Sequence, residues 1–179
     1  MHRSIAFAGA LVLGLAAAAL AQGPPVPQPG PAHEVLKRDV GVWDTTLDIV
    51  PGPGMPPMTM TGVETNTLFA GRWLLTEFKS DMMGQPFEGH GIGGWDPQKK
   101  SYVSAWADTM ATSVSRGEAT FDAATDTMTG WMEVQDPMGG TTRVKTVAAW
   151  PAAGSRLVKM YMPETASEPY MTITYTKRP

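Results

Sequence analysis

The stretch that most constrains the fold of this chain is a glycine-rich hairpin at residues 84–108. It has the pattern of two β-strands joined by a tight turn at residues 95–100, where the Asp96 side chain can cap the turn and Pro97 fixes one backbone angle. Four glycines crowd the incoming strand, at positions Gly89, Gly91, Gly93 and Gly94. Glycine inside a strand indicates a bend, a bulge or a close approach to the backbone, and a sheet that bends here can curl into a barrel.

Further short strands, separated by turn residues, precede and follow this hairpin. They are predicted at residues 41–50, 59–69, 72–82, 112–121, 127–135, 141–150, 156–162 and 169–177. Consecutive, hairpin-linked strands are typical of an antiparallel sandwich or barrel. An open meander of about ten strands would leave two exposed edges, so we predict an all-β, antiparallel up-and-down barrel. One short helix is expected before it, at residues 32–40.

The first 32 residues have two other patterns. Residues 1–21 combine a basic start, an apolar run and an A-x-A site, which predicts a signal peptide cleaved after Ala21 and a periplasmic or secreted protein. Residues 22–32 are rich in proline and are predicted to form a linker. The barrel domain is then expected at residues 33–177. Because the chain contains no cysteine, its core must hold the fold without disulfides.

Charge and hydropathy exclude some classes of partner. The formal net charge is −3, and the basic residues are scattered, so no nucleic-acid or anionic-lipid partner is expected. After residue 21 no apolar run is long enough for a membrane-spanning helix, so no span is predicted. The sequence leaves the oligomeric state open.

Several short motifs occur together over residues 33–177. They are Leu36-x-x-x-Val40-Gly41-x-Trp43, Gly71-Arg72-Trp73-Leu74, Met83-Gly84-x-Pro86-Phe87-Glu88-Gly89-His90-Gly91, Gly94-Trp95-Asp96, Lys100-x-Tyr102-Val103, Trp106-x-Asp108 and Ile173-Thr174-Tyr175-Thr176. The Gly41-x-Trp43 opening resembles that of lipocalins and other calycins, and the whole series resembles an uncharacterised bacterial family known only as a domain of unknown function. The resemblance implies a calycin-like, lipocalin-like β-barrel and says nearly nothing about activity.

A related calycin family, the haem-binding nitrobindins, holds iron through a histidine near the end of the chain. This chain has no histidine at residues 170–178, so no haem and no other cofactor is expected. Trp43 is predicted to close one end of the barrel beneath the helix, covered by Lys177 or Arg178 through a cation–π contact.

The hairpin also offers polar groups that could serve a site. Glu88 and His90 share one strand face, Asp108 lies on the partner strand, and Arg72 begins an adjacent strand. If that face points inward, these groups could orient a ligand head group or move a proton. The commoner arrangement is an outward polar face, with the glycines needed for curvature. Gly89–Gly94 also matches the G-x-G-x-x-G pattern, but a strand follows instead of a helix, so a dinucleotide site is rejected.

The chain contains thirteen methionines, several at alternating strand positions. Methionine adapts to irregular space, so Met132 and Met160 could line a cavity for varied apolar ligands; an ordinary filled core is the alternative. Separately, Met55, Met58 and Met60 resemble a thioether cluster that could hold Cu(I). A proline-braced loop with incidental methionines would have the same sequence.

The leading hypothesis is an exported protein that binds a small apolar or amphipathic molecule inside its barrel. The residues predicted to bind the ligand are Arg72, Glu88, His90, Trp106, Asp108, Met132 and Met160. The alternatives are an enzyme that uses Glu88, His90 and Asp108, which is the less favoured hypothesis, and the Cu(I) protein.

Overall fold

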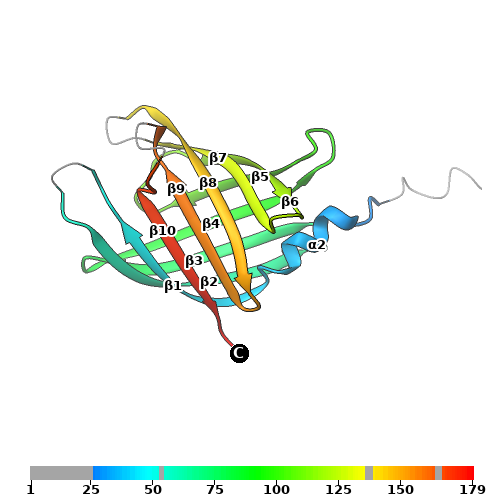
Figure 1. Ribbon diagram of the computed structural model, residues 1–179, viewed down its shortest axis with the longest axis horizontal. Coiled ribbons are helices and arrows are strands. Elements are labelled where there is room, and N and C mark those ends of the chain that lie inside the picture. The colour runs from blue at the N-terminus through cyan, green and yellow to red at the C-terminus, as the bar shows by residue number, and fades with distance from the viewer. Residues whose placement is uncertain (1–25, 53–54, 136–138, 164–166) are drawn as a thin grey trace, which may run out of the picture.

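The computed structural model describes residues 26–52, 55–135, 139–163 and 167–179. The predicted signal peptide and its cleavage point after Ala21 lie outside the described residues. The described chain forms one helix and ten strands (Figure 1). They are α2 (Pro31–Lys37), β1 (Gly41–Ile49), β2 (Met58–Phe69), β3 (Trp73–Met82), β4 (Gln85–Asp96), β5 (Ser101–Asp108), β6 (Ser115–Asp122), β7 (Thr127–Gln135), β8 (Thr141–Ala152), β9 (Ser155–Tyr161) and β10 (Met171–Lys177).

The ten strands close into one antiparallel barrel. Each strand pairs with its neighbours in the sequence, and β1 pairs with β10 to close the sheet. In this closing pair Asp44 lies opposite Thr176, and Thr46 lies opposite Thr174. The predicted up-and-down barrel is therefore confirmed, and closure leaves the sheet without a free edge.

The helix α2 lies at the end of the barrel where β1 begins and β10 ends (Figure 1). Pro31 stands at its first position, Glu34 in the first turn and Lys37 in the last, as expected for these residue types. The helix ends three residues before the predicted limit, because the amides of Asp39 and Val40 bond three residues back instead of four.

The predicted linker also contacts the barrel at its described end. Nη1 of Arg72 donates a hydrogen bond to the carbonyl of Pro27 at 2.9 Å. The Tyr102 hydroxyl donates to the carbonyl of Ala32 at 2.7 Å. These contacts tie the segment before α2 to the turn before β3, and the start of α2 to β5.

Trp43 closes this end, as predicted. It is 1% exposed, and its Nε1 donates to the carbonyl of Asp39 at 2.8 Å. Nζ of Lys177 lies 5.4 Å from the ring centroid, so the predicted cation–π contact with Lys177 is confirmed. The other residue considered, Arg178, pairs with Asp44 on the surface instead.

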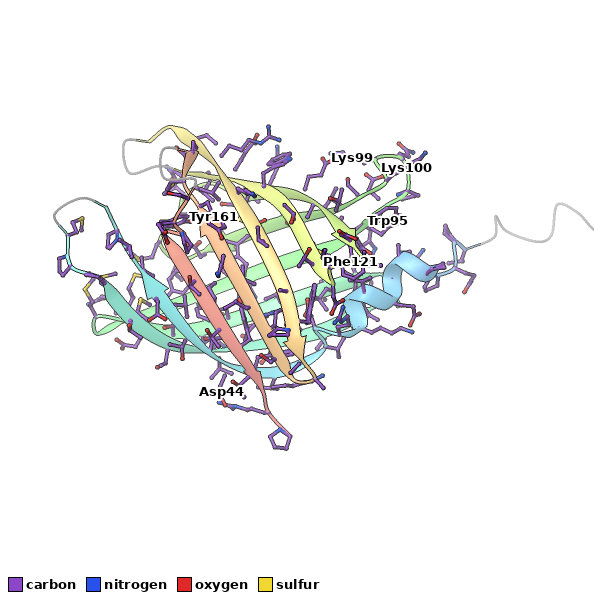
Figure 2. All side chains as sticks on the ribbon, viewed as in Figure 1. Asp44, Trp95, Lys99, Lys100, Phe121 and Tyr161 are labelled. Atoms are coloured by element: carbon purple, nitrogen blue, oxygen red, sulfur yellow. The ribbon has the colours of Figure 1, made fainter. Side chains whose placement is uncertain are left out.

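The glycine-rich strand β4 makes room for a large side chain of β5. Gly89 and Gly91 lie opposite Asp108 and Trp106, and the Trp106 ring lies across both glycines. Residues on either side of these glycines therefore point away from the interior. At the β4–β5 turn Lys99 and Lys100 reach into solvent, as predicted (Figure 2).

Candidate functional site

The barrel is hollow. It encloses a cavity of about 930 Å³, lined by residues of all ten strands and by Asp39 from the segment after α2. The cavity reaches the loops at the opposite end, where Met110, Thr112 and Gly139 line it. The alternative of a completely filled core is therefore excluded.

Most of the cavity wall is apolar, and methionine is its most frequent residue type. Seven methionines line it: Met60, Met82, Met110, Met128, Met132, Met160 and Met171. On one side Leu47, Met60 and Phe78 form a buried cluster, against which Trp106 packs. Flexible thioether side chains can adjust to apolar ligands of different shape.

The floor of the cavity, near Trp43, is charged. Nη1 of Arg156 forms an ion pair with Oδ1 of Asp39 at 3.2 Å, and Nη2 donates a hydrogen bond to Oε1 of Glu64. Asn66 donates from Nδ2 to the same Glu64 oxygen at 2.7 Å, and Trp150 donates from Nε1 to Oδ1 of Asp39 at 2.9 Å. A buried arginine is thus shared by two carboxylates. We call Asp39, Glu64 and Arg156 the floor triad.

The surroundings keep Arg156 charged. Burial alone disfavours a guanidinium, yet Tyr175, Asp39 and Glu64 together raise the pKa of Arg156 above its ordinary value. The guanidinium also stacks on the Tyr175 ring, 3.7 Å from its centroid. Burial, reinforced by Glu64, raises the pKa of the Tyr175 hydroxyl, so this phenol stays neutral.

At the other end of the cavity the polar groups satisfy one another. Oδ2 of Asp108 accepts a hydrogen bond from Nε1 of Trp106 at 2.9 Å. Oδ1 of Asp108 accepts from the amides of Met110 and Ala111, at 2.9 and 3.0 Å. Asp108 therefore fixes both the Trp106 ring and the loop at the mouth.

Of the residues predicted to bind a ligand, four line the cavity: Trp106, Asp108, Met132 and Met160. Three lie elsewhere. Arg72 lies at the turn before β3, where it contacts Pro27. Glu88 and His90 lie on the outer face of β4.

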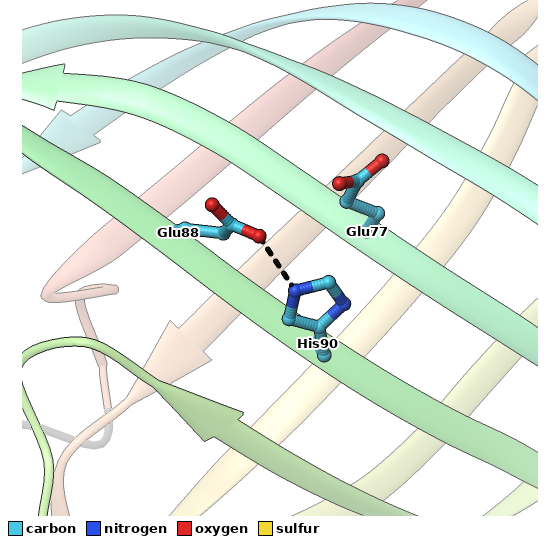
Figure 3. Close-up of side chains that lie close together, drawn as sticks. All are labelled: Glu77, Glu88 and His90. Carbon is cyan, nitrogen blue, oxygen red and sulfur yellow. Dashed lines mark hydrogen bonds and ion pairs between the residues drawn. The ribbon is translucent and has the colours of Figure 1, made fainter.

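Of the two arrangements considered for Glu88 and His90, the structure has the outward polar face. Nε2 of His90 lies 2.8 Å from Oε1 of Glu88, and the His90 side chain is 60% exposed (Figure 3). Glu88 and His90 do share one face of β4, as the alternation predicts. Gly89 and Gly91 occupy the inward positions because the Trp106 ring needs the space. An enzyme that joins Glu88, His90 and Asp108 is excluded, because the barrel wall separates the first two from the third.

One group of three side chains among the described residues could bind a metal ion together. It consists of Glu77, Glu88 and His90. Their ligand atoms lie within 4.8 Å of one another. Lys79 already pairs with Glu77 at 2.5 Å, and its hydrogen bond lowers the pKa of that carboxyl. The cluster is a solvated, internally paired surface, and we assign no metal to it.

The donors considered for haem and for Cu(I) are also dispersed. Neither His33 nor His90, the two described histidines, lines the cavity; Nδ1 of His33 accepts from the Gly30 amide at 2.9 Å. Met55 is 58% exposed, whereas Met60 is buried beside Leu47. The thioethers of the proposed Cu(I) cluster therefore lie in different environments.

The floor triad was not predicted from the sequence. A signal for it exists, because Glu64 lies in phase with Met60 on β2, and Arg156 lies in phase with Met160 on β9. Charged residues at positions whose neighbours in phase are apolar are candidates for a buried polar site.

Comparison with known proteins places these features in context. Residues 28–177 match the model of the family described as "Protein of unknown function (DUF1579)". A search of curated proteins finds no match. The crystal structure of Rv2717c from M. tuberculosis is similar in fold, with a TM-score of 0.62 and 10% identity, covering 84% of this chain and 99% of that chain. A redesigned β-barrel matches with a TM-score of 0.45 and 14% identity, covering 86% and 100% of the two chains.

Among the described residues, no helix has the length and apolar character needed to cross a membrane.

Proposed function

The chain belongs to the DUF1579 family of proteins of unknown function, and we propose that it binds a small apolar or amphipathic molecule inside its barrel. The observation that carries this proposal is the cavity of about 930 Å³ with its methionine-rich wall. Small-molecule sites commonly have volumes of about 300–1,000 Å³ and apolar walls with a few polar groups. This cavity has both properties.

The proposal includes export. The pattern of residues 1–21 supports a carrier that acts in the periplasm or outside the cell. Mass spectrometry of the intact mature protein tests this part. A mass that begins at Gln22 supports it, and a mass that retains residues 1–21 contradicts it.

Binding can be tested with an uncharged fluorescent probe, N-phenyl-1-naphthylamine, whose emission rises in an apolar site. Ala148 lines the cavity, so Ala148→Trp fills part of it and should weaken probe binding about tenfold or more. Ala107→Trp is the matched control, because Ala107 is exposed on the outer face opposite His90. It should bind the probe as the wild type does.

Two results would contradict the proposal. One is a probe signal that the Ala148→Trp and Ala107→Trp variants change equally, since the probe would then lie on the surface. The other is native mass spectrometry that detects only the apo mass after purification and after incubation with a series of alkyl ligands.

A further inference from the structure

We propose that the cavity selects amphipathic molecules with a cationic head group, such as alkylammonium compounds, and rejects fatty-acid-like anions. This inference rests on the proposed function, since it assigns the ligand class of the same cavity. Its basis is the charge of the floor triad, in which one guanidinium faces two carboxylates.

The two carboxylates of the triad keep free acceptor capacity. Oδ1 of Asp39 and Oε1 of Glu64 are occupied by Arg156 and its neighbours. The second oxygens, Oδ2 and Oε2, accept no hydrogen bond from the described residues. Three side-chain polar atoms of the described chain are fully covered and have no partner: Thr45 Oγ1, Arg72 Nε and Arg156 Nε. The two carboxylate oxygens are not among them. Both oxygens therefore keep some exposed surface, and both residues line the cavity.

Arg156 itself offers little to an anion. Nη1 forms an ion pair with Asp39 and Nη2 a hydrogen bond with Glu64, while Nε has no partner but is fully covered. One face of its guanidinium stacks on Tyr175. A ligand carboxylate would compete with two protein carboxylates for this guanidinium, and displacing one of them from its buried ion pair leaves that group uncompensated.

The rest of the cavity reinforces this preference. Among the described residues that line it, Arg156 is the one with a positive charge. Three other cations of the described chain contact lining residues but do not line the cavity themselves. They are Arg38 over Trp150, Lys99 beside Glu118 and Arg143 over Trp131. In an apolar cavity a net negative charge is poorly screened, so it attracts a cation strongly and repels an anion.

The geometry gives the bound ligand one orientation. Its head group would contact Oε2 of Glu64 and Oδ2 of Asp39 at the floor. Its apolar tail would follow the methionine wall toward Met110 and Thr112 at the mouth. Burial of the tail supplies affinity, and the floor triad supplies specificity.

The test uses three ligands with the same tail: dodecylamine, dodecanol and dodecanoate. Each displaces N-phenyl-1-naphthylamine from the full mature protein near neutral pH, below micellar concentrations. We expect dodecylamine to bind at least about tenfold more tightly than dodecanoate, with dodecanol between them.

Variants that remove a charge and keep the shape of the side chain test whether the floor triad causes the preference for the amine. Glu64→Gln retains an oxygen for Arg156 and Asn66, and Asp39→Asn retains one for Trp150. Each should reduce the amine-to-acid preference about tenfold or more, and the double variant, with one net positive charge, should favour dodecanoate. Glu133→Gln makes the same change in total charge on the exposed face of β7 and should keep the wild-type preference.

The outcomes separate this inference from the proposed function. Equal or tighter binding of dodecanoate to the wild type overturns the inference, as does an unchanged preference in the double variant while dodecanol still binds. Failure of all three ligands to displace the probe overturns the proposed function itself. Binding of dodecanol to each variant shows that its barrel is folded and open.

Discussion

Gly89 and Trp106 fit together so closely that the glycine cannot carry a side chain. A Cβ atom on Gly89 would overlap Cζ2 of the indole and lie 2.7 Å from Cη2. Trp106 is in turn fixed by its hydrogen bond to Asp108. The glycines of β4 therefore allow a large aromatic side chain to lie flat against the wall of the cavity.

This relationship predicts that Gly89→Ala destabilises the barrel. The added methyl must displace the indole, and such overpacking typically costs about 1–3 kcal/mol. Chemical denaturation measures the loss. Gly93→Ala is the matched control, because a Cβ there would meet its nearest atom at an ordinary 3.6 Å. Equal losses in the two variants would show that strand glycines in general, and not the Trp106 contact, determine the effect.

Trp43→Ala should be more damaging, with a loss of about 3–5 kcal/mol in the free energy of unfolding. Trp43 is fully buried, and its removal also exposes the underside of the floor triad. Trp131→Ala is the comparison, because Trp131 is half-buried and Arg143 covers its ring from 3.6 Å. Thermal unfolding that shows the larger loss for Trp131→Ala would contradict the plug role of Trp43.

The closed barrel was predictable because its determinants are local. Alternating strands, turn residues such as Asp96 and Pro97, and the Gly41-x-Trp43 opening each act over a few residues. The methionine-lined strands were predictable for the same reason, since Met128 is in phase with Met132 on β7 and Val158 is in phase with Met160 on β9.

The orientation of β4 was not predictable from its own residues. Alternation divides a strand into two faces without saying which one is inside. Here the choice depends on Trp106 of the next strand, whose bulk requires Gly89 and Gly91 inside and puts His90 outside. The floor triad was harder still, because closure joins Glu64 and Arg156 across 92 residues.

The outer position of His90 predicts that His90→Ala leaves ligand binding unchanged. Its imidazole contacts Glu88 on the solvent side of the wall and does not reach the cavity. Met132→Gln, by contrast, places an amide in the apolar wall and should weaken binding of the uncharged probe about tenfold. A probe titration of both variants decides the matter, and a weaker affinity in His90→Ala would place the ligand on the outer face.

The ion pair between Arg38 and Asp126 should make stability depend on acidic pH. Hydrogen bonds from Arg38 lower the pKa of the Asp126 carboxyl in the folded protein. Its contribution is therefore present above the unfolded value of about 4 and is lost as the pH falls through the lower folded value. Asp126→Asn should be less stable than the wild type at neutral pH, and the two should converge below about pH 4. A constant difference in unfolding midpoint down to pH 3 would contradict an ionic origin.

Tyr170 should make stability depend on alkaline pH. It lies just before β10, where its amide bonds to the Met160 carbonyl and its hydroxyl contacts the Met160 sulfur. Burial raises the pKa of this phenol to about 12, from an ordinary value of 10.0. Between these values the unfolded chain releases the proton and the folded chain retains it, so stability falls as the pH rises.

In Tyr170→Phe that proton is absent, and urea denaturation from pH 9 to pH 12 should give a shallower decline, by up to about 2 kcal/mol at the upper end. Tyr161→Phe removes a phenol from the outer face beside Lys145 and should keep the wild-type decline. Parallel declines in the wild type and Tyr170→Phe would show that this hydroxyl already reaches water in the folded protein.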